Sequence, residues 1–289
     1  LRYFRRSSWM AVFFCQDFVM TTESEYQTGI VGAGWLGLPL ARTLQAEGRE
    51  VAVTVSSVEK AAQLTAEGLQ AWPLQLGTGL TALPFRCREL VICVPPSKVE
   101  DYPAAIGRVA ELAQAAGVQR LLFVSATSVW APGQEEDEHP MPAHERGMRM
   151  LASEQAAMGA GIPCAMVLRP AGLYGPQRHP GRFLAGKTLE GGGQAVNLVH
   201  LDDVVAACQL LLAQGKDGDA YNLSAPVHPR REQFYPFAAR QLGLPAPVFI
   251  EPAGQFVPVE GLRICEQLGF AYRWPDPAHW FAELAARGH

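Results

Sequence analysis

A glycine-rich turn near the N-terminus constrains the fold of this chain more than any other segment. Residues 29–37 have the sequence GIVGAGWLG, so a short apolar run enters the pattern G-x-G-x-x-G, and a helix-like stretch follows over 38–47. Gly32 would permit a tight turn, Gly34 would let the backbone approach a ligand closely, and Gly37 would let the helix pack against its strand. Free N–H groups at the start of such a helix attract phosphate. The segment therefore predicts a dinucleotide-binding strand–turn–helix unit.

Strand and helix patterns alternate through the first two-thirds of the chain. Apolar runs typical of buried parallel strands occur at 30–31, 51–55, 71–76, 89–94, 121–124 and 164–168. Helical patterns separate several of them, at 38–47, 61–67, 102–116 and 146–158. This rhythm predicts an α/β protein with a Rossmann-type doubly wound parallel sheet, in which helices cover both faces.

The residue composition changes after Arg169, and glycine and proline are frequent over 172–193. Further strands are predicted at 196–200 and 221–223, and further helices at 203–212, 231–242 and about 261–268. We therefore expect a dinucleotide-binding domain over 26–170 that is completed by about 195–225. Residues 171–194 and 226–289 are expected to form a small C-terminal substrate-binding lobe.

Composition limits the classes of function. The 289 residues carry a net charge of −4 without a basic stripe, which argues against a nucleic-acid partner. The six cysteines have no C-x-x-C or metal-ligand spacing, so we expect no metal site and reduced thiols in a cytoplasmic protein. Beyond the N-terminal segment no run approaches the roughly 20 apolar residues of a membrane span. Residues 1–25 are expected to be an extension outside the fold, with a natural start near Met20, in preference to a targeting segment.

Four further motifs follow one another in order along the chain. They are VSATSVW at 124–130, LRPAGLYGP at 168–176, NLVHLDDV at 197–204 and YNL at 221–223. With the glycine-rich turn they resemble the extended short-chain dehydrogenases of the NAD-dependent epimerase/dehydratase superfamily. RHPGRFLAGK at 178–187 resembles the atypical YeeZ-like group of that superfamily. The resemblance implies NAD or NADP as cofactor, a nucleotide-sugar-like or other anionic small molecule as substrate, and a homodimer paired through helices.

The resemblance also implies a catalytic serine, tyrosine and lysine, and the chain departs from this set. The best counterpart of the Tyr-x-x-x-Lys pair runs from Glu145 to Arg149, and the family serine falls on Ala126. A glutamate of ordinary pKa is ionised at neutral pH and is a poor acid, while arginine cannot exchange a proton. The candidate catalytic residues are therefore Glu145, Arg149, Thr127 and Tyr174, with a His144–Glu145 proton relay as one alternative.

The residues expected to bind the adenosine ribose favour NADP over NAD. About 20 residues past the glycine-rich turn, where this fold usually carries an acidic ribose ligand, the chain has Ser56, Ser57 and Lys60. Small hydroxyls and a lysine suit a 2′-phosphate, although the serines also suit a helix N-cap and Glu59 remains an alternative ribose ligand. The candidate cofactor-binding residues are Gly32, Gly34, Trp35, Leu36, Gly37, Ser56, Ser57, Val94, Pro95, Ser125 and Arg149.

A basic loop gives the strongest indication of substrate chemistry. Arg178, His179, Arg182 and Lys187 fall within ten residues of a chain with negative net charge. Such a cluster suits phosphate or carboxylate groups, and a solvated surface loop is the alternative. We consider two functions: an NAD(P)-dependent oxidoreductase or epimerase/dehydratase-like enzyme without the usual Ser-Tyr-Lys set, or a non-catalytic NAD(P)-binding sensor or regulatory protein. Neither hypothesis involves a membrane.

Overall fold

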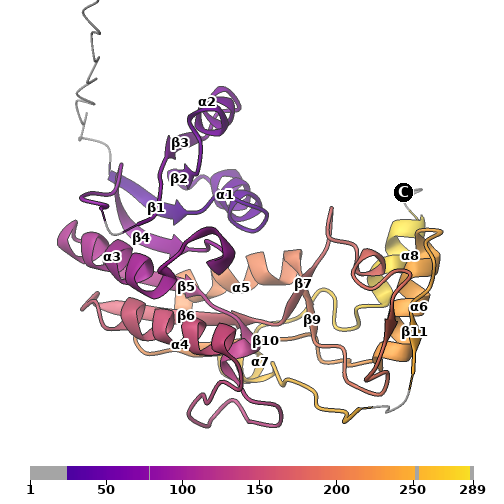
Figure 1. Ribbon diagram of the computed structural model, residues 1–289. Helices are drawn as coiled ribbons and strands as arrows, with labels where there is room; N and C mark the ends of the chain where they lie inside the picture. Colours follow the sequence, from indigo (N-terminus) through magenta and orange to yellow (C-terminus); the bar gives the residue numbers. More distant parts are fainter. Residues whose placement is uncertain (1–24, 78, 251–253, 287–289) are drawn as a thin grey trace, which may run out of the picture.

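A seven-stranded parallel sheet forms the centre of the computed structural model, which describes residues 25–77, 79–250 and 254–286 (Figure 1). The strand order is β10-β6-β5-β4-β1-β2-β3. The strands are β1 (Glu25–Val31), β2 (Val51–Val55), β3 (Gln70–Pro73), β4 (Arg86–Ile92), β5 (Arg120–Val124), β6 (Cys164–Pro170) and β10 (Ala220–Leu223). The predicted doubly wound parallel sheet is confirmed.

Helices cover both faces of this sheet, which together with them forms the body of the molecule. One face carries α1 (Gly37–Ala46), α2 (Val58–Ala66) and α5 (Leu201–Gln214), and the other carries α3 (Tyr102–Ala115) and α4 (Glu145–Met158). The central strand β4 explains the two layers: the Val91 side chain enters one core, and those of Leu90 and Ile92 enter the other. Side chains of a strand alternate between faces, so a strand buried on both faces must be apolar throughout.

Helix α3 shows how local sequence sets the helix ends. The Asp101 side chain accepts a hydrogen bond from the Ala104 N–H at 3.2 Å, and Pro103 occupies the first turn, where it removes no intrahelical bond. After the last turn Gly117 adopts φ +85°, a conformation that favours glycine. The predicted helix therefore begins and ends within a residue of its observed bounds.

A smaller lobe packs beside the body at the carboxyl ends of the strands (Figure 1). It contains the pairs β7 (Gly172–Tyr174) with β9 (Leu198–His200) and β8 (Thr188–Leu189) with β11 (Val248–Phe249), together with α6 (Arg231–Gln241) and α8 (His279–Ala286). A separate aromatic core holds the lobe together; its members include Tyr174, Phe234, Trp274, Trp280 and Phe281. Helix α8 was not predicted.

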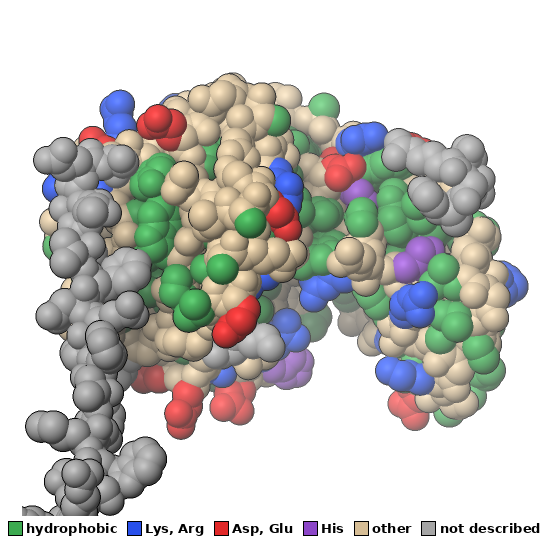
Figure 2. Space-filling view, turned by 90° about the horizontal axis from the view of Figure 1, so that it is seen from above, with side chains coloured by type: hydrophobic (Ala, Val, Ile, Leu, Met, Phe, Trp, Pro, Cys, Tyr) green, Lys and Arg blue, Asp and Glu red, His purple; other side chains and the backbone are tan. Residues whose placement is uncertain are grey.

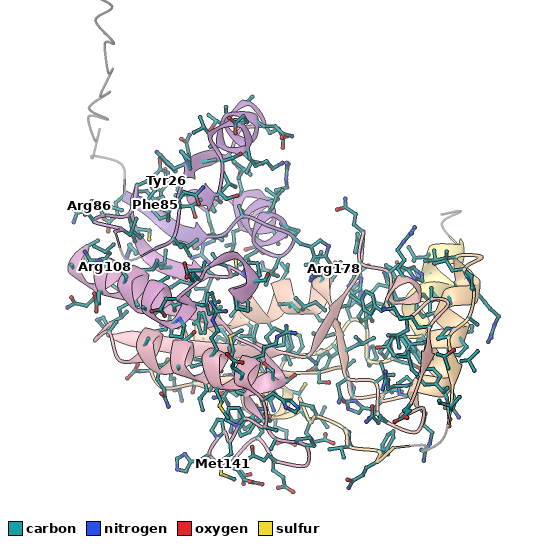
Figure 3. All side chains as sticks on the ribbon, viewed as in Figure 1. Tyr26, Phe85, Arg86, Arg108, Met141 and Arg178 are labelled. Atoms are coloured by element: carbon teal, nitrogen blue, oxygen red, sulfur yellow. The ribbon has the colours of Figure 1, made fainter. Side chains whose placement is uncertain are left out.

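Two predicted boundaries need correction. Helix α7 (Arg263–Leu268) falls in the predicted lobe, but Ile264 and Phe270 belong to a core of the body. Strand β1 includes Glu25, because Glu25 and Tyr26 pair with the start of β4, and Tyr26 lies beside Phe85 with ring centroids 6.3 Å apart (Figure 3). Residues 1–24, which hold the rest of the predicted extension, lie outside the described residues.

Within the described ranges, no helix has both the length and the apolar character that crossing a membrane requires. The cysteines of this part of the chain are all free thiols, at positions 87, 93, 164, 208 and 265. Burial raises the pKa of the Cys87 and Cys93 thiols to about 12, which keeps both groups protonated. These thiols therefore behave as small apolar side chains.

Candidate cofactor and substrate crevice

The candidate site lies where the strand order reverses, between β1 and β4. In open parallel sheets ligands bind outside the carboxyl ends of the strands at such a point. Two cavities meet there and share Gly34, Val94 and Pro95. We call them the fingerprint cavity, of about 340 Å³ beside β2, and the lobe-side cavity, of about 400 Å³ between the body and the lobe. The space-filling view shows a hollow between body and lobe (Figure 2).

The three glycines of the turn meet three different steric demands. Gly32 has φ +100°, and a Cβ there would lie 2.7 Å from the Val94 side chain. At Gly37 a Cβ would lie 2.3 Å from the Gly32 carbonyl oxygen, so only glycine lets α1 approach β1 this closely. A Cβ at Gly34 would meet no described atom within 4 Å, because Gly34 faces the cavities. The geometry agrees with the predicted division of roles.

The start of α1 leaves backbone donors available to a ligand. Leu36 occupies the N-cap and provides no side-chain cap, while Trp35 and Leu36 both line the lobe-side cavity. Thr54, at the end of β2, fixes the turn: its hydroxyl accepts the Gly32 N–H at 3.2 Å and its carbonyl accepts the Ala33 N–H at 2.7 Å. Thr54 was not predicted as part of the site, although it is a polar residue within an otherwise apolar strand.

The fingerprint cavity carries a positive charge on its side beside α2. Ser56 and Lys60 line it, whereas the Ser57 hydroxyl caps α2 by accepting the Lys60 N–H at 3.2 Å. Glu59 is not among the lining residues; hydrogen bonds from its own backbone N–H and the Ser57 hydroxyl lower the pKa of its carboxyl group. The described lining of this cavity contains no carboxylate. Ser57 therefore takes the capping role that was the alternative to ribose binding.

Helix α4 turns a different face to the crevice from the one expected. Arg146 and Met150 line the lobe-side cavity. Glu145 and Arg149 instead line a neighbouring cavity of about 590 Å³. The Arg149 guanidinium donates to the carbonyl oxygens of Val99 and Glu100.

Arg146 and Met150, in place of the predicted Glu145 and Arg149, are therefore the α4 residues that line the lobe-side cavity. Successive helical residues point about 100° apart, so a shift of one position changes the face. His144 is exposed at the N-cap of α4 and lines neither cavity of the crevice, so a His144–Glu145 relay does not face it.

A buried polar network lies beneath the lobe-side cavity. The Ser125 hydroxyl, at the end of β5, donates to Glu154 Oε1 at 2.5 Å. Arg169 on β6 donates three hydrogen bonds to the same carboxylate: from Nε to Oε1 at 3.0 Å and to Oε2 at 3.3 Å, and from Nη2 to Oε2 at 2.7 Å. Both charged side chains are buried, as such a pair requires. Ser125 is thereby oriented. Glu154 was not predicted as part of the site; it lies two turns after Arg146 on α4.

Two other predicted catalytic residues lie away from this cavity. Thr127 lines a separate cavity with Trp130 and Asn197. Tyr174 is fully buried in the lobe core, and its ring lies 5.6 Å from that of Trp280. Burial raises the pKa of its hydroxyl, which has no hydrogen-bond partner among the described residues. A donor role for Tyr174 at the crevice is therefore wrong in this arrangement.

The predicted basic cluster does not assemble. Arg178 alone lines the lobe-side cavity, where its guanidinium stacks 4.7 Å from the Trp35 ring at the lobe edge facing α1 (Figure 3). His179 is buried, and its Nδ1 accepts the Gly181 N–H at 3.0 Å; burial and then Arg182 lower its pKa. Arg182 is exposed, and Lys187 donates to a backbone carbonyl. The loop turns sharply enough to point neighbouring side chains in different directions.

Comparisons with known proteins agree with this geometry. Residues 105–224 match the model of the NAD dependent epimerase/dehydratase family. Protein YeeZ of Escherichia coli K12 is 38% identical over 267 residues, which cover 87% of this chain and 97% of YeeZ.

Solved structures share the fold at lower identity. A conserved protein of unknown function from Silicibacter pomeroyi DSS is 23% identical, with a TM-score of 0.75, and the match covers 91% of this chain and 99% of that one. The dTDP-glucose 4,6-dehydratase DesIV of Streptomyces venezuelae, solved with NAD and TYD bound, is 20% identical, with a TM-score of 0.74 and coverage of 89% and 95%. The chain thus belongs to the NAD-dependent epimerase/dehydratase family and, within it, to the group of YeeZ.

Proposed function

We propose that this protein is an NAD(P)-dependent enzyme of the oxidoreductase or epimerase/dehydratase type that acts on an anionic or nucleotide-sugar-like small molecule. The observation that carries the proposal is the pair of cavities joined at Gly34. The fingerprint cavity would hold the adenosine end of a dinucleotide, and the lobe-side cavity the nicotinamide end beside Ser125. When bound, the nicotinamide supplies hydride transfer, which no protein side chain provides.

The same geometry supports NADP as the preferred cofactor. Ser56 and Lys60 would bind a 2′-phosphate, because a hydroxyl and an ammonium both donate to phosphate oxygens and no described lining carboxylate repels it. NAD-binding relatives of this fold usually place an acidic residue in this zone. Pairing of two copies through α3 and α4 remains a prediction, which sedimentation of the purified chain tests.

Ser125 is the residue that we expect to meet the substrate hydroxyl. Its own hydrogen is directed to Glu154, so its oxygen presents lone pairs to the cavity and would accept a hydrogen bond from the substrate. Val94 and Pro95 form a stiff apolar wall that would exclude water from one side. No tyrosine or lysine lines this cavity among the described residues, so the proton relay usual in the family would be absent.

That departure favours a second candidate function, a dinucleotide-binding sensor without catalysis. Trp35 in the glycine-rich turn donates from Nε1 to the Pro176 carbonyl of the lobe at 2.8 Å. A dinucleotide bound at the turn would therefore contact a segment that is hydrogen-bonded to the lobe through Trp35. In this case binding would alter the lobe without turnover of any substrate.

Calorimetric titration with NADPH and with NADH tests the proposal. We expect tighter binding of NADPH, and we expect Lys60→Gln to weaken NADPH binding about tenfold while NADH binding stays unchanged. Lys216→Gln, which removes an exposed lysine far from the crevice, is the matched control. Absence of binding for both dinucleotides would remove the basis of both candidate functions. Turnover of an anionic carbonyl or hydroxyl compound with the bound cofactor would favour the enzyme over the sensor.

A further inference from the structure

The lobe-side cavity carries charge of one sign only. Its charged lining residues are Arg146 and Arg178, and neither aspartate nor glutamate occurs in the described lining. The chain as a whole has a net charge of −4, so the positive charge of this cavity is opposite in sign to that of the whole chain. The carboxylate beneath the cavity, Glu154, is already bound by Arg169 and Ser125. Two positive charges from opposite walls therefore face a cavity that offers them no counter-charge.

Helix stability does not explain the position of Arg146. The residue lies in the first turn of α4, where the helix dipole disfavours a positive charge. The guanidinium has no hydrogen bond or ion pair to any described residue. Its backbone is nevertheless fixed, because a Cβ at the adjacent Gly147 would lie 2.1 Å from the Ser128 carbonyl oxygen. The close contact of α4 with the loop after β5 holds Arg146 in place relative to Ser125.

Arg178 is held by a strained turn. Gln177 has φ +65° and is the one non-glycine residue with positive φ in the described ranges, and Gly175 has φ +147°. Backbone bonds between Gly175 and Arg178 close the turn at 2.9 and 3.3 Å. The Arg178 guanidinium stacks on Trp35, and stacking leaves the in-plane N–H donors free for a ligand. Strain of this kind persists at sites where it positions a functional group.

We propose that Arg146 and Arg178 bind one anionic group of the substrate, a carboxylate or a phosphate, while Ser125 accepts a hydrogen bond from a hydroxyl of the same molecule. The inference rests on the proposed function and narrows it. The substrate would be a small molecule that combines an anionic group with a hydroxyl, such as a hydroxy acid or a phosphorylated alcohol. Glu145, Arg149, His179, Arg182 and Lys187 would have no direct part in this contact.

Titration with two simple anions, malonate and inorganic phosphate, tests the two-arginine site. Each is titrated into the full chain with and without the dinucleotide that binds. We expect the protein to bind one of them, which identifies carboxylate or phosphate as the preferred group. Arg146→Gln and Arg178→Gln should each lower the affinity for that anion about 10- to 100-fold, because each substitution removes charged hydrogen bonds. Arg146→Lys should lower this affinity less than Arg146→Gln does, since lysine keeps the positive charge but lacks the paired N–H donors.

The controls separate this inference from the proposed function. Arg240→Gln removes an exposed charge of α6 outside the cavity and should bind the anion as the original chain does. Dinucleotide titrations of the same two arginine variants distinguish a loss of the anion site from a loss of the cofactor site. Anion binding that is undetectable, or equal in all variants, overturns the two-arginine site even when the dinucleotide binds. If Arg178→Gln lowers the affinity for the dinucleotide but not for the anion, Arg178 binds the cofactor and the two-arginine site is likewise overturned.

Discussion

The fingerprint cavity and the lobe-side cavity adjoin at Gly34, yet they differ in how they depend on sequence. The first is built from backbone: a positive φ at Gly32 and a helix-to-strand contact at Gly37 leave room for nothing but glycine. The second is built from side chains on α4, at the end of β5 and on the lobe loop. Steric demands on a backbone leave a recognisable pattern of residues, whereas the chemistry of a cavity can change without altering its framework.

The largest expected effect tests the framework of the lobe-side cavity. Glu154→Ala should lower the free energy of unfolding by about 3–5 kcal/mol, because it leaves the buried Arg169 without its counter-charge. Urea unfolding measures the change. The double variant Glu154→Ala with Arg169→Met should recover part of the loss, since no charge is then buried alone. A loss below about 1 kcal/mol in the single variant would mean that water or movement of Arg169 compensates.

The lobe core should respond to pH through His200, which is buried beside Tyr174 and Trp274. Burial lowers its pKa to about 4, with Asp202 opposing and Arg273 adding to the shift. The imidazole is thus neutral when folded and becomes charged more readily when unfolded. Its contribution to stability is complete above about pH 6.5 and is lost as the pH falls toward 4, by at most about 3 kcal/mol.

Comparison with His200→Asn isolates this effect. Asparagine retains an acceptor for the Asp202 N–H that His200 Nδ1 now accepts at 3.1 Å. The variant should be less stable at pH 7, and its deficit relative to the original chain should shrink between pH 6.5 and 4 as urea unfolding is repeated. His279→Asn, at an exposed position, should show no such trend. A deficit that stays constant with pH would show that His200 is not buried in neutral form.

A pair of substitutions at the turn separates stability from binding in the fingerprint cavity. Gly37→Ala should cost about 1–3 kcal/mol in unfolding free energy, because its Cβ would meet the Gly32 carbonyl oxygen. Gly34→Ala should leave unfolding within about 0.5 kcal/mol, since its Cβ meets no described atom, but should weaken dinucleotide binding. Equal dinucleotide affinity in Gly34→Ala and the original chain would contradict the placement of the cofactor across Gly34.

The smallest expected effect tests which residue at the start of α4 faces the crevice. Glu145→Gln changes an exposed side chain that lines the neighbouring cavity, so dinucleotide and anion affinities should each stay within about twofold. Calorimetric titration of both ligands measures this. A larger loss than that in Arg146→Gln would restore Glu145 as the α4 residue that faces the crevice.

Much of the fold could be predicted from the sequence because its strands are continuous apolar runs and its helices carry local end signals. Strand β4 and helix α3 follow directly from such patterns. Helix α8 and the attachment of α7 to the body could not be predicted, because they depend on contacts between residues far apart in the chain, such as the packing of α7 against β10.

The site was predictable where backbone shape decides the residue type, as at Gly32 and Gly37. It was not predictable on α4, where Glu145 and Arg146 are adjacent and only the three-dimensional packing of Gly147 against Ser128 sets which one faces the crevice. The prediction of a basic cluster failed for a related reason: the short turn at Pro180–Arg182 leaves His179 buried and Arg182 exposed, and this depends on how the loop packs in three dimensions.

The bond from Trp35 to Pro176 has a consequence for the order of synthesis. The two residues are 141 positions apart, so the glycine-rich turn, although translated early, lacks this partner until the lobe loop has been made. The edge strand β10 follows later still, at Ala220–Leu223. A nascent chain can therefore form β1, α1 and β2 locally, but the crevice lacks its lobe wall and the sheet its edge strand until both of these later segments have been translated.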